Sequence, residues 1–384
     1  MEELHVHDLY INDLEIDKFA GMIKDNTQCY KFYWLESLLN LLAAGKKEIT
    51  YFEAITEMII LAWYTVTYYH LSTGSDLKAL HQVNALESAI KALQSVAELD
   101  ENADIEVIRE AILEHRDDKN FKGTLNNLTR YVPYAALKSF GVSLRVENKK
   151  SNSKERIITY YNEINKTNPL PYYFGGGNGL DTCVIWNDCW ANMVLENLCI
   201  IKDWINYNKI LYLQKRNPGV PGIAFKLDRA KVRKLNDVRN LWKIIMDSYL
   251  VIDIYDPEIV LNGTAYDVDH YIPWSFVAAD ELWNLCPVDS SLNRKKSNSL
   301  PIWERYFTAF ANNQLLIRNG IHENEKIQKA FEKCRKDNLN AIWCQSLYNM
   351  QSDQEFVNAL EENLYPIYKS AKIQGFSIWN GPAI

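Results

Sequence analysis

Residues 266–301 read YDVDHYIPWSFVAADELWNLCPVDSSLNRKKSNSLP, and this stretch carries the strongest structural signal in the 384-residue chain. Alternating and β-branched residues predict two strands here, over 265–272 and 282–288. Asp289 follows the second strand and can cap a short helix. The predicted order is strand, loop, strand, helix, which brings one carboxylate, one imidazole and two carboxamides towards a common point. These groups belong to Asp269, His270, Asn284 and Asn293.

The stretch resembles the HNH endonucleases, whose ββα-metal fold has a variant in which Asn replaces the last His. The nearest pattern is the HNH domain of the RNA-guided CRISPR effectors, which shares the Asp-x-Asp-His opening at 267–270. It also shares an Asn fourteen residues after the His and another twenty-three after it, here Asn284 and Asn293. The Lys of its closing Asn-x-x-Lys-Ser falls at Lys296. The sequence pattern is also similar to that of stand-alone bacterial HNH proteins of restriction and phage defence. The resemblance covers roughly 40–50 residues.

These residue types suit phosphodiester hydrolysis. A phosphate anion repels hydroxide, so the reaction needs a cation to neutralise charge and a base to activate water. Asp269 and Asn293 offer the sparse oxygen ligands that Mg²⁺ prefers, with Mn²⁺ as the alternative. His270 titrates near neutrality and can take the proton of the attacking water. Lys296, one helical turn after Asn293, is expected to reach a phosphate oxygen.

The resemblance implies two further properties. By this resemblance, Asn284 does not bind the metal. It is expected to hold the loop so that His270 keeps its productive tautomer and orientation. The metal also stabilises the leaving 3′ oxygen, so the product carries a 5′ phosphate.

The rest of the chain is predicted to be mainly helical, giving a mainly α (α+β) fold. Four segments are expected: a helical domain over 1–145, a helical and basic connecting region over 146–249, the HNH module over 250–302, and a helical C-terminal segment over 303–384. Apolar spacing predicts helices over Tyr30–Leu42, Tyr51–Leu71, Leu77–Ala97, Ile105–His115 and Cys183–Tyr207. A polar linker is expected over Lys149–Arg156 and a loop over Asn168–Gly179. The only strands expected outside the quoted stretch lie in Leu250–Leu261.

The formal net charge of −7 hides an uneven distribution. Residues 1–120 hold 10 basic and 22 acidic groups, residues 121–240 hold 19 and 9, and residues 241–384 hold 13 and 18. A basic helix is predicted over Leu227–Ser248, just before the HNH stretch. Such a run of basic residues is either an ordinary solvent-exposed face or a surface that binds a phosphate backbone, and the sequence favours neither interpretation over the other. The candidate nucleic-acid contacts are Arg229, Arg233, Lys234 and Lys295.

Bulk features favour a cytoplasmic protein with no membrane span. The longest apolar run, Met58–Tyr69, has 12 residues, too few for a bilayer and typical of a buried core helix. No signal peptide is visible at the N-terminus. The seven cysteines form no Cys-x-x-Cys pair, which argues against a disulfide framework and a zinc ribbon.

The sequence therefore predicts a metal-dependent HNH endonuclease whose partner is nucleic acid, most simply DNA, with a role in bacterial restriction or phage defence. Two alternatives stay open: an HNH nuclease that cleaves RNA, and a catalytically silent adaptor that only grips nucleic acid. The acidic N-terminal helical region is expected to face a protein partner, a second copy of the chain, or solvent.

Overall fold

The computed structural model describes residues 4, 6, 13–24, 29–74, 84–141, 154–230 and 233–382. The chain divides into two compact units. Unit 1 comprises Met1–Pro218 with Leu227–Arg229, and unit 2 comprises Gly219–Lys226 with Ala230–Ile384. The predicted connecting region 146–249 is shared between them. The described part is mainly helical with small sheets, which confirms the mainly α (α+β) prediction.

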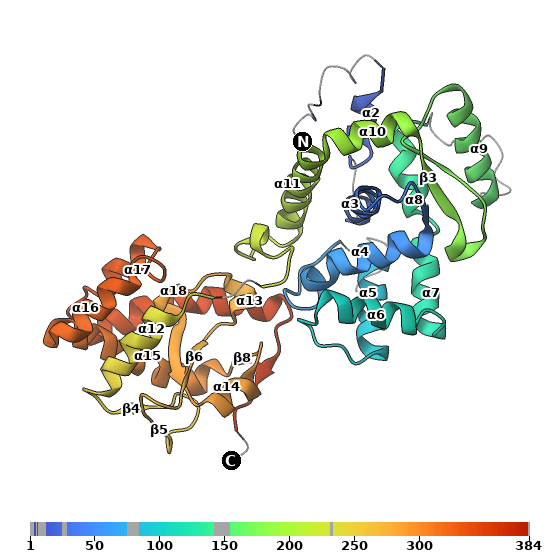
Figure 1. Ribbon diagram of the computed structural model, residues 1–384. Coiled ribbons are helices and arrows are strands. Elements are labelled where there is room, and N and C mark those ends of the chain that lie inside the picture. The colour runs from blue at the N-terminus through green and yellow to red at the C-terminus, as the bar shows by residue number, and fades with distance from the viewer. Residues whose placement is uncertain are drawn as a thin grey trace. The chain divides into compact units, whose positions relative to one another are not determined.

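Unit 1 is a helical assembly around the adjacent helices α3 and α4 (Figure 1). Its helices are α2 (Ile16–Gly21), α3 (Tyr30–Ala43), α4 (Tyr51–Val66), α5 (Ala85–Val96), α6 (Ile105–Glu114), α7 (Lys119–Leu128), α8 (Val132–Ala136), α9 (Lys154–Thr167), α10 (Asp188–Glu196) and α11 (Leu198–Arg216). Helix α4 begins at a capping box in which Thr50 and Glu53 each satisfy the other's main-chain amide. Met58 and Trp63 on this helix are fully buried, as predicted for the longest apolar run.

Unit 1 also contains a small antiparallel sheet that the sequence patterns did not predict. Its strands are β1 (Glu48–Thr50), β2 (Tyr172–Phe174) and β3 (Cys183–Trp186), in the order β1-β3-β2. The prediction of helix from Cys183 and the prediction of a loop throughout Asn168–Gly179 are therefore wrong at these strands. Strands of three or four residues are too short to show a period, and β1 pairs with a strand more than 130 residues away.

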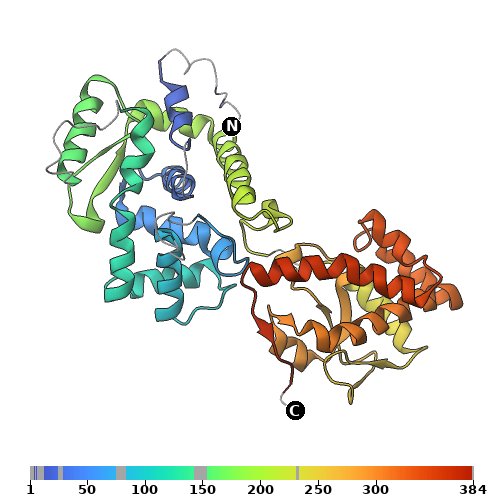
Figure 2. The ribbon, with the colours of Figure 1, turned by 180° about the vertical axis from the view of Figure 1, so that it is seen from behind.

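Unit 2 holds the HNH-like stretch within a helical frame. It contains α12 (Asn236–Met246), α13 (Trp274–Val277), α14 (Ser290–Lys296), α15 (Trp303–Glu323), α16 (Glu325–Cys334), α17 (Ile342–Leu347) and α18 (Asp353–Ile373). Its strands form three pairs: β4 (Val251–Ile252) with β5 (Val260–Leu261), β6 (Asp267–His270) with β7 (Leu285–Val288), and β8 (Leu300–Pro301) with β9 (Ile378–Trp379). Helices α15 and α18 pack against each other in both views (Figure 1, Figure 2).

The predicted strand, loop, strand, helix order is present in unit 2. Strands β6 and β7 are antiparallel, with His270 opposite Leu285 and Asp269 opposite Cys286. Asp289 caps α14 as predicted, because its side chain accepts the amide protons of Ser291 and Leu292. Helix α15 supports the hairpin from behind: Gln314 donates to the carbonyl of Leu285 at 2.8 Å.

Several predicted boundaries differ from the structure. The basic helix does not span Leu227–Ser248, because α12 begins only at Asn236 and the described residues before it are not helical. Asn284 lies in a 3-10 turn, Leu282–Asn284, and not within the second strand. The predicted linker over Lys149–Arg156 is wrong from residue 154, where α9 begins, and its earlier residues lie outside the described part. Residues 77–83 of one predicted helix also lie outside it.

Candidate active site

The site is built where the face of β6 meets α14. Side chains two residues apart on a strand share a face, and side chains three apart on a helix do so as well. Accordingly, Asp267 and Asp269 on β6 meet Asn293 and Lys296 on α14 in the same order. The Asn293 amide nitrogen donates to Asp267 Oδ2 at 3.2 Å, and Lys296 Nζ lies 3.0 Å from Asp269 Oδ2. Figure 1 shows α14 beside β6.

Asp269 is a buried carboxylate with a fixed set of partners. Lys296 Nζ contacts both of its oxygens, at 3.0 Å and 3.3 Å, and also donates to the His270 carbonyl at 2.9 Å. The Tyr255 hydroxyl donates to Asp269 Oδ2 at 3.1 Å. Burial, and next the negative charge of Asp269, raise the pKa of Tyr255 well above its usual value, so its hydroxyl keeps its proton. The structure thus directs Lys296 inward to Asp269, although the sequence predicted a contact with phosphate.

The donor set at this face fits a magnesium-like cation. Asp269 supplies carboxylate oxygen, and Asn293 uses its amide nitrogen on Asp267, which leaves its carbonyl oxygen as the atom able to bind a cation. Among the residues that the structure describes, no group of three or more His, Cys, Asp or Glu side chains is placed to hold a metal. A cation here would therefore have few protein ligands and share Asp269 with Lys296, the sparse oxygen shell that Mg²⁺ tolerates.

His270 is buried and held at both ring nitrogens. Its Nε2 lies 2.9 Å from Asp280 Oδ1, and its Nδ1 lies 3.3 Å from Arg233 Nη1. A guanidinium can only donate, so Nδ1 must be the acceptor and the ring proton sits on Nε2, donated to Asp280. Burial lowers the pKa of His270; Asp280 works against this shift and Arg233 adds to it. The ring is therefore neutral near pH 7, with its basic lone pair on Nδ1.

Asn284 closes the loop that follows His270. It is fully buried, and its side chain makes two hydrogen bonds of 2.8 Å with the main chain of Ile272, one to the carbonyl and one from the amide. Its own carbonyl accepts the Tyr271 amide proton at 2.9 Å. Every polar atom of the side chain is committed to the loop, so Asn284 is placed to hold it; the consequence for catalysis stays a prediction.

The predicted nucleic-acid contacts separate into three cases. Arg229 belongs to unit 1, where it pairs with Asp104, and its contact with nucleic acid stays a prediction. Arg233 is exposed and touches His270 directly. Lys234 and Lys295 are exposed residues of unit 2, and their contact with nucleic acid stays a prediction.

Sequence reasoning missed three residues of this site: Tyr255, Asp253 and Asp280. Asp253 accepts the amide protons of Tyr255 at 2.7 Å and of Asp289 at 2.6 Å, so one carboxylate ties the Tyr255 loop to the start of α14. Asp280 had a usable signal, since an acidic residue in the loop after a reactive His is a candidate partner for it. Tyr255 and Asp253 had none, because they lie outside the quoted stretch.

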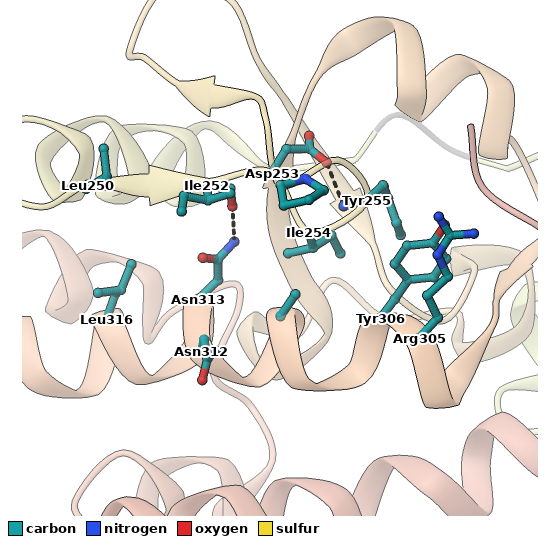
Figure 3. Close-up of a pocket in the computed structure, with 12 residues that line it drawn as sticks. Leu250, Ile252, Asp253, Ile254, Tyr255, Arg305, Tyr306, Asn312, Asn313 and Leu316 are labelled. Atoms are coloured by element: carbon teal, nitrogen blue, oxygen red, sulfur yellow. Dashed lines mark hydrogen bonds between the residues drawn. The ribbon is translucent and has the colours of Figure 1, made fainter. Parts of the chain in front are cut away.

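A cavity of about 460 Å³ lies behind this loop, between β4 and α15 (Figure 3). Asp253 and Tyr255 line it together with Tyr306, Arg305 and Asn313, and Asn313 donates to the carbonyl of Ile252 at 3.2 Å. The Asp253 carboxylate is already occupied by main-chain amides, and burial raises its pKa. The cavity therefore borders residues that support Asp269 and the start of α14, and the Asp253 carboxylate that lines it already has partners.

Comparison with protein families matches residues 253–302 to the family described as HNH endonuclease. The match covers 50 of the 384 residues and confirms the resemblance inferred from the quoted stretch. It indicates a nuclease that acts on nucleic acid, in a class that is generally dependent on a divalent metal. Comparisons with curated proteins and with solved structures gave no match. In the described part of the chain, no helix combines the length and apolar character needed to cross a bilayer.

Proposed function

We propose that this protein is a metal-dependent endonuclease that hydrolyses phosphodiester bonds in DNA. One observation carries the proposal: His270, next in sequence to Asp269, is a buried imidazole whose contacts with Asp280 and Arg233 leave Nδ1 as its basic nitrogen. The family match over 253–302 supports the same reaction class. A buried His held in one tautomer beside a candidate cation site is the arrangement that general-base hydrolysis requires.

In this proposal His270 is the general base. Nδ1 takes a proton from the attacking water, which leaves an imidazolium whose Nε2–H still donates to Asp280. The negative charge of Asp280 favours that imidazolium, as a carboxylate does for the base of a hydrolytic triad. The exposed residue Arg233 contacts Nδ1 of the buried His270 ring. When the substrate binds, the guanidinium moves to the anionic phosphate, which frees Nδ1 for the water.

Asp269 and Asn293 would hold the divalent cation, Mg²⁺ or Mn²⁺. When bound, the cation would neutralise charge on the phosphate and stabilise the leaving oxygen. Lys296 stays against Asp269 and balances its charge, so the carboxylate keeps its position whether or not a cation is present. Tyr255 adds a neutral donor to the same carboxylate.

The proposed DNA contacts are exposed cations of unit 2. Arg233 contacts His270, and Arg239 on α12 lies 4.0 Å from Asp267, so each cation reaches a different residue of β6. Two further exposed lysines are proposed contacts: Lys234, next to Arg233, and Lys295 on α14. Cations placed in this way bind the phosphate backbone of any sequence, so they support nucleic-acid binding and leave the target sequence to other contacts.

A cleavage assay tests the proposal. The full-length protein is incubated with Mg²⁺ or Mn²⁺ and with plasmid, linear duplex, single-stranded DNA or RNA, and chelator and His270→Ala serve as controls. We expect metal-dependent cutting of DNA that is lost in His270→Ala. Cutting confined to RNA would favour the RNA-cleaving alternative. Binding without cutting of any substrate would leave the silent adaptor, and equal cutting by wild type and His270→Ala would contradict the proposed nuclease site.

The proposed setting is the bacterial cytoplasm, with a role in restriction or phage defence. The resemblance to stand-alone HNH proteins supports the role, and the seven free thiols accord with a reducing compartment. Cells that express the wild type should show a lower efficiency of phage plating than cells that express His270→Ala. Equal plating over a diverse phage panel would count against the role and leave the chemistry untouched.

The acidic N-terminal region is proposed to contact a protein partner or a second copy of the chain. Its 22 acidic groups against 10 basic ones over residues 1–120 make it a poor surface for DNA. Light scattering over a range of concentrations distinguishes self-association from a monomer. If the protein is a monomer at all concentrations, a second copy of the chain is excluded and only a different protein partner remains.

A further inference from the structure

His270 is held by two residues that come from opposite sides of it in the sequence. Asp280 lies in the loop between β6 and β7, and Arg233 precedes α12. Neither side chain belongs to a strand or helix of the catalytic hairpin. Their positions relative to the imidazole therefore depend on what fixes the two segments that carry them.

Both segments are fixed by one buried amide, that of Asn338. Its Nδ2 donates to the Asp280 carbonyl at 2.7 Å and faces the Lys234 carbonyl at 3.4 Å, next to Arg233. The main-chain carbonyl of Asn338 accepts the Leu282 amide proton at 2.8 Å, which holds the end of the Asp280 loop that leads into β7. The residue is fully buried, 36 positions beyond the last residue of the family match.

A second contact attaches the same loop to the same segment. Both carboxylate oxygens of Glu281 accept the Asn340 amide proton, at 3.0 Å and 3.1 Å. Glu281 is buried, so this charge-assisted contact is shielded from water. Asp280, Glu281 and Leu282 are thus each hydrogen-bonded to residues within 338–340.

We propose that Asp280 and Asn338 are positioning residues for the general base, so that the C-terminal helical segment is a working part of the catalytic site. The inference rests on the proposed function of His270. Asp280 fixes the tautomer and the rotation of the imidazole through Nε2. Asn338 fixes Asp280 and the main chain beside Arg233, the two contacts on either edge of the ring. Small errors in the placement of a catalytic group lower the rate by large factors, so the Asn338 amide can affect the rate without touching the substrate.

The first test reads the tautomer of His270 without any cleavage. Two-bond proton–nitrogen NMR spectra of protein labelled with ¹⁵N-histidine distinguish Nε2–H from Nδ1–H rings, and His270→Gln assigns the signal among the seven histidines. In the wild type at mildly alkaline pH, His270 should be an Nε2–H ring. Asp280→Ala and Asn338→Ala should weaken that preference. A wild-type ring protonated on Nδ1, or spectra unchanged by both variants, would overturn the inference whatever the enzyme cuts.

The second test is kinetic and uses a matched control two residues away. Asn340 is exposed, and its side chain reaches only the Asp337 carbonyl at 3.3 Å, so Asn340→Ala should behave as wild type. Asp280→Ala and Asn338→Ala should lower kcat by roughly 10- to 100-fold with KM little changed, the size typical of groups that orient a reactive His. The same two substitutions should not lower the rate further in a His270→Gly background that is rescued by free imidazole, because the added base needs no positioning.

The outcomes separate this inference from the proposed function. Absence of cleavage by the wild type contradicts the nuclease proposal, while the NMR test still decides the roles of Asp280 and Asn338. Cleavage by the wild type with equal kcat in Asn338→Ala and Asn340→Ala contradicts the positioning role of Asn338. Penalties that persist in the imidazole-rescued background would show that the variants damage the fold and do not act through His270.

Discussion

Replacing Asn284 with Ala removes the contact that closes the loop after His270. The side chain is fully buried and makes two hydrogen bonds of 2.8 Å, one to the carbonyl and one from the amide of Ile272. Ile272 is itself buried, so water does not replace the lost partner readily. The variant therefore leaves one amide proton and one carbonyl without partners inside the protein.

The size of the effect follows from those two groups. An unpaired buried polar group costs about 1–3 kcal/mol, so Asn284→Ala should destabilise the hairpin by about 2–6 kcal/mol. Asn284→Asp separates hydrogen bonding from volume, because it keeps the size of the side chain and its acceptor. It replaces the donor by an oxygen that faces the Ile272 carbonyl, so we expect it to be no more stable than the Ala variant.

Hydrogen exchange measured by mass spectrometry is the suitable assay, because two compact units need not unfold in one step. Peptides that cover β6 and β7 should lose protection, while peptides from α3 and α4 should keep it. Asn262→Ala is the control: its side chain is exposed and contacts only Thr264, in the turn after β5. If Asn284→Ala and Asn262→Ala had equal effects, or if protection fell equally in both units, the assignment of Asn284 to the loop would be refuted.

Further predictions concern the charges and donors around the hairpin. Because burial lowers the pKa of His270, the acid limb of kcat/KM against pH should have its midpoint below the ordinary value of about 6.5; a midpoint at or above that value would contradict a buried neutral base. Lys296→Met leaves Asp269 without its counterion and should cost about 3–5 kcal/mol in denaturant unfolding, partly restored by Mg²⁺; a variant as stable as wild type would show that the pair is exposed in solution. Tyr255→Phe removes a donor to the same carboxylate and should cost about 1.5–3 kcal/mol of unfolding free energy. Burial lowers the pKa of Lys226 to about 7, so the folded state holds fewer protons than the unfolded state from about pH 7 to 10.5. Stability should rise by up to about 5 kcal/mol over that window, and Lys226→Met should abolish this rise.

The catalytic hairpin was predictable because its chemistry is local. Asp267 and Asp269 are two residues apart on a strand and Asn293 and Lys296 are three apart on a helix, so the spacing alone predicts that each pair shares a face. The cap at Asp289 and the burial of Met58 and Trp63 follow from equally local patterns. The short strand β1 was not predictable, because its three residues show no period and its partner, β3, is more than 130 residues away.

The orientation of individual side chains was less predictable than their presence. A lysine one turn after Asn293 can face solvent or the strand, and helical spacing alone does not choose between them. The choice depends on Asp269, which is buried and needs a counterion, so Lys296 turns inward. The position of Asn338 was beyond sequence reasoning for a related reason: a buried amide that bonds main-chain carbonyls requires no particular residue type at the other end of the bond.

The inward lysine also bears on how this site uses a metal. A carboxylate that is buried without a positive partner would force the hairpin to bind a cation in order to fold, as structural metal sites do. Lys296 removes that requirement, because its ammonium contacts both oxygens of Asp269 and the carbonyl of His270. The hairpin can then be fully formed before a cation arrives. A cation that binds has to share Asp269 with a charge already in place, which weakens its affinity. In such a site the protein alone forms the fold and the metal is needed only for the reaction. Removal of the metal should therefore end catalysis and leave the fold intact.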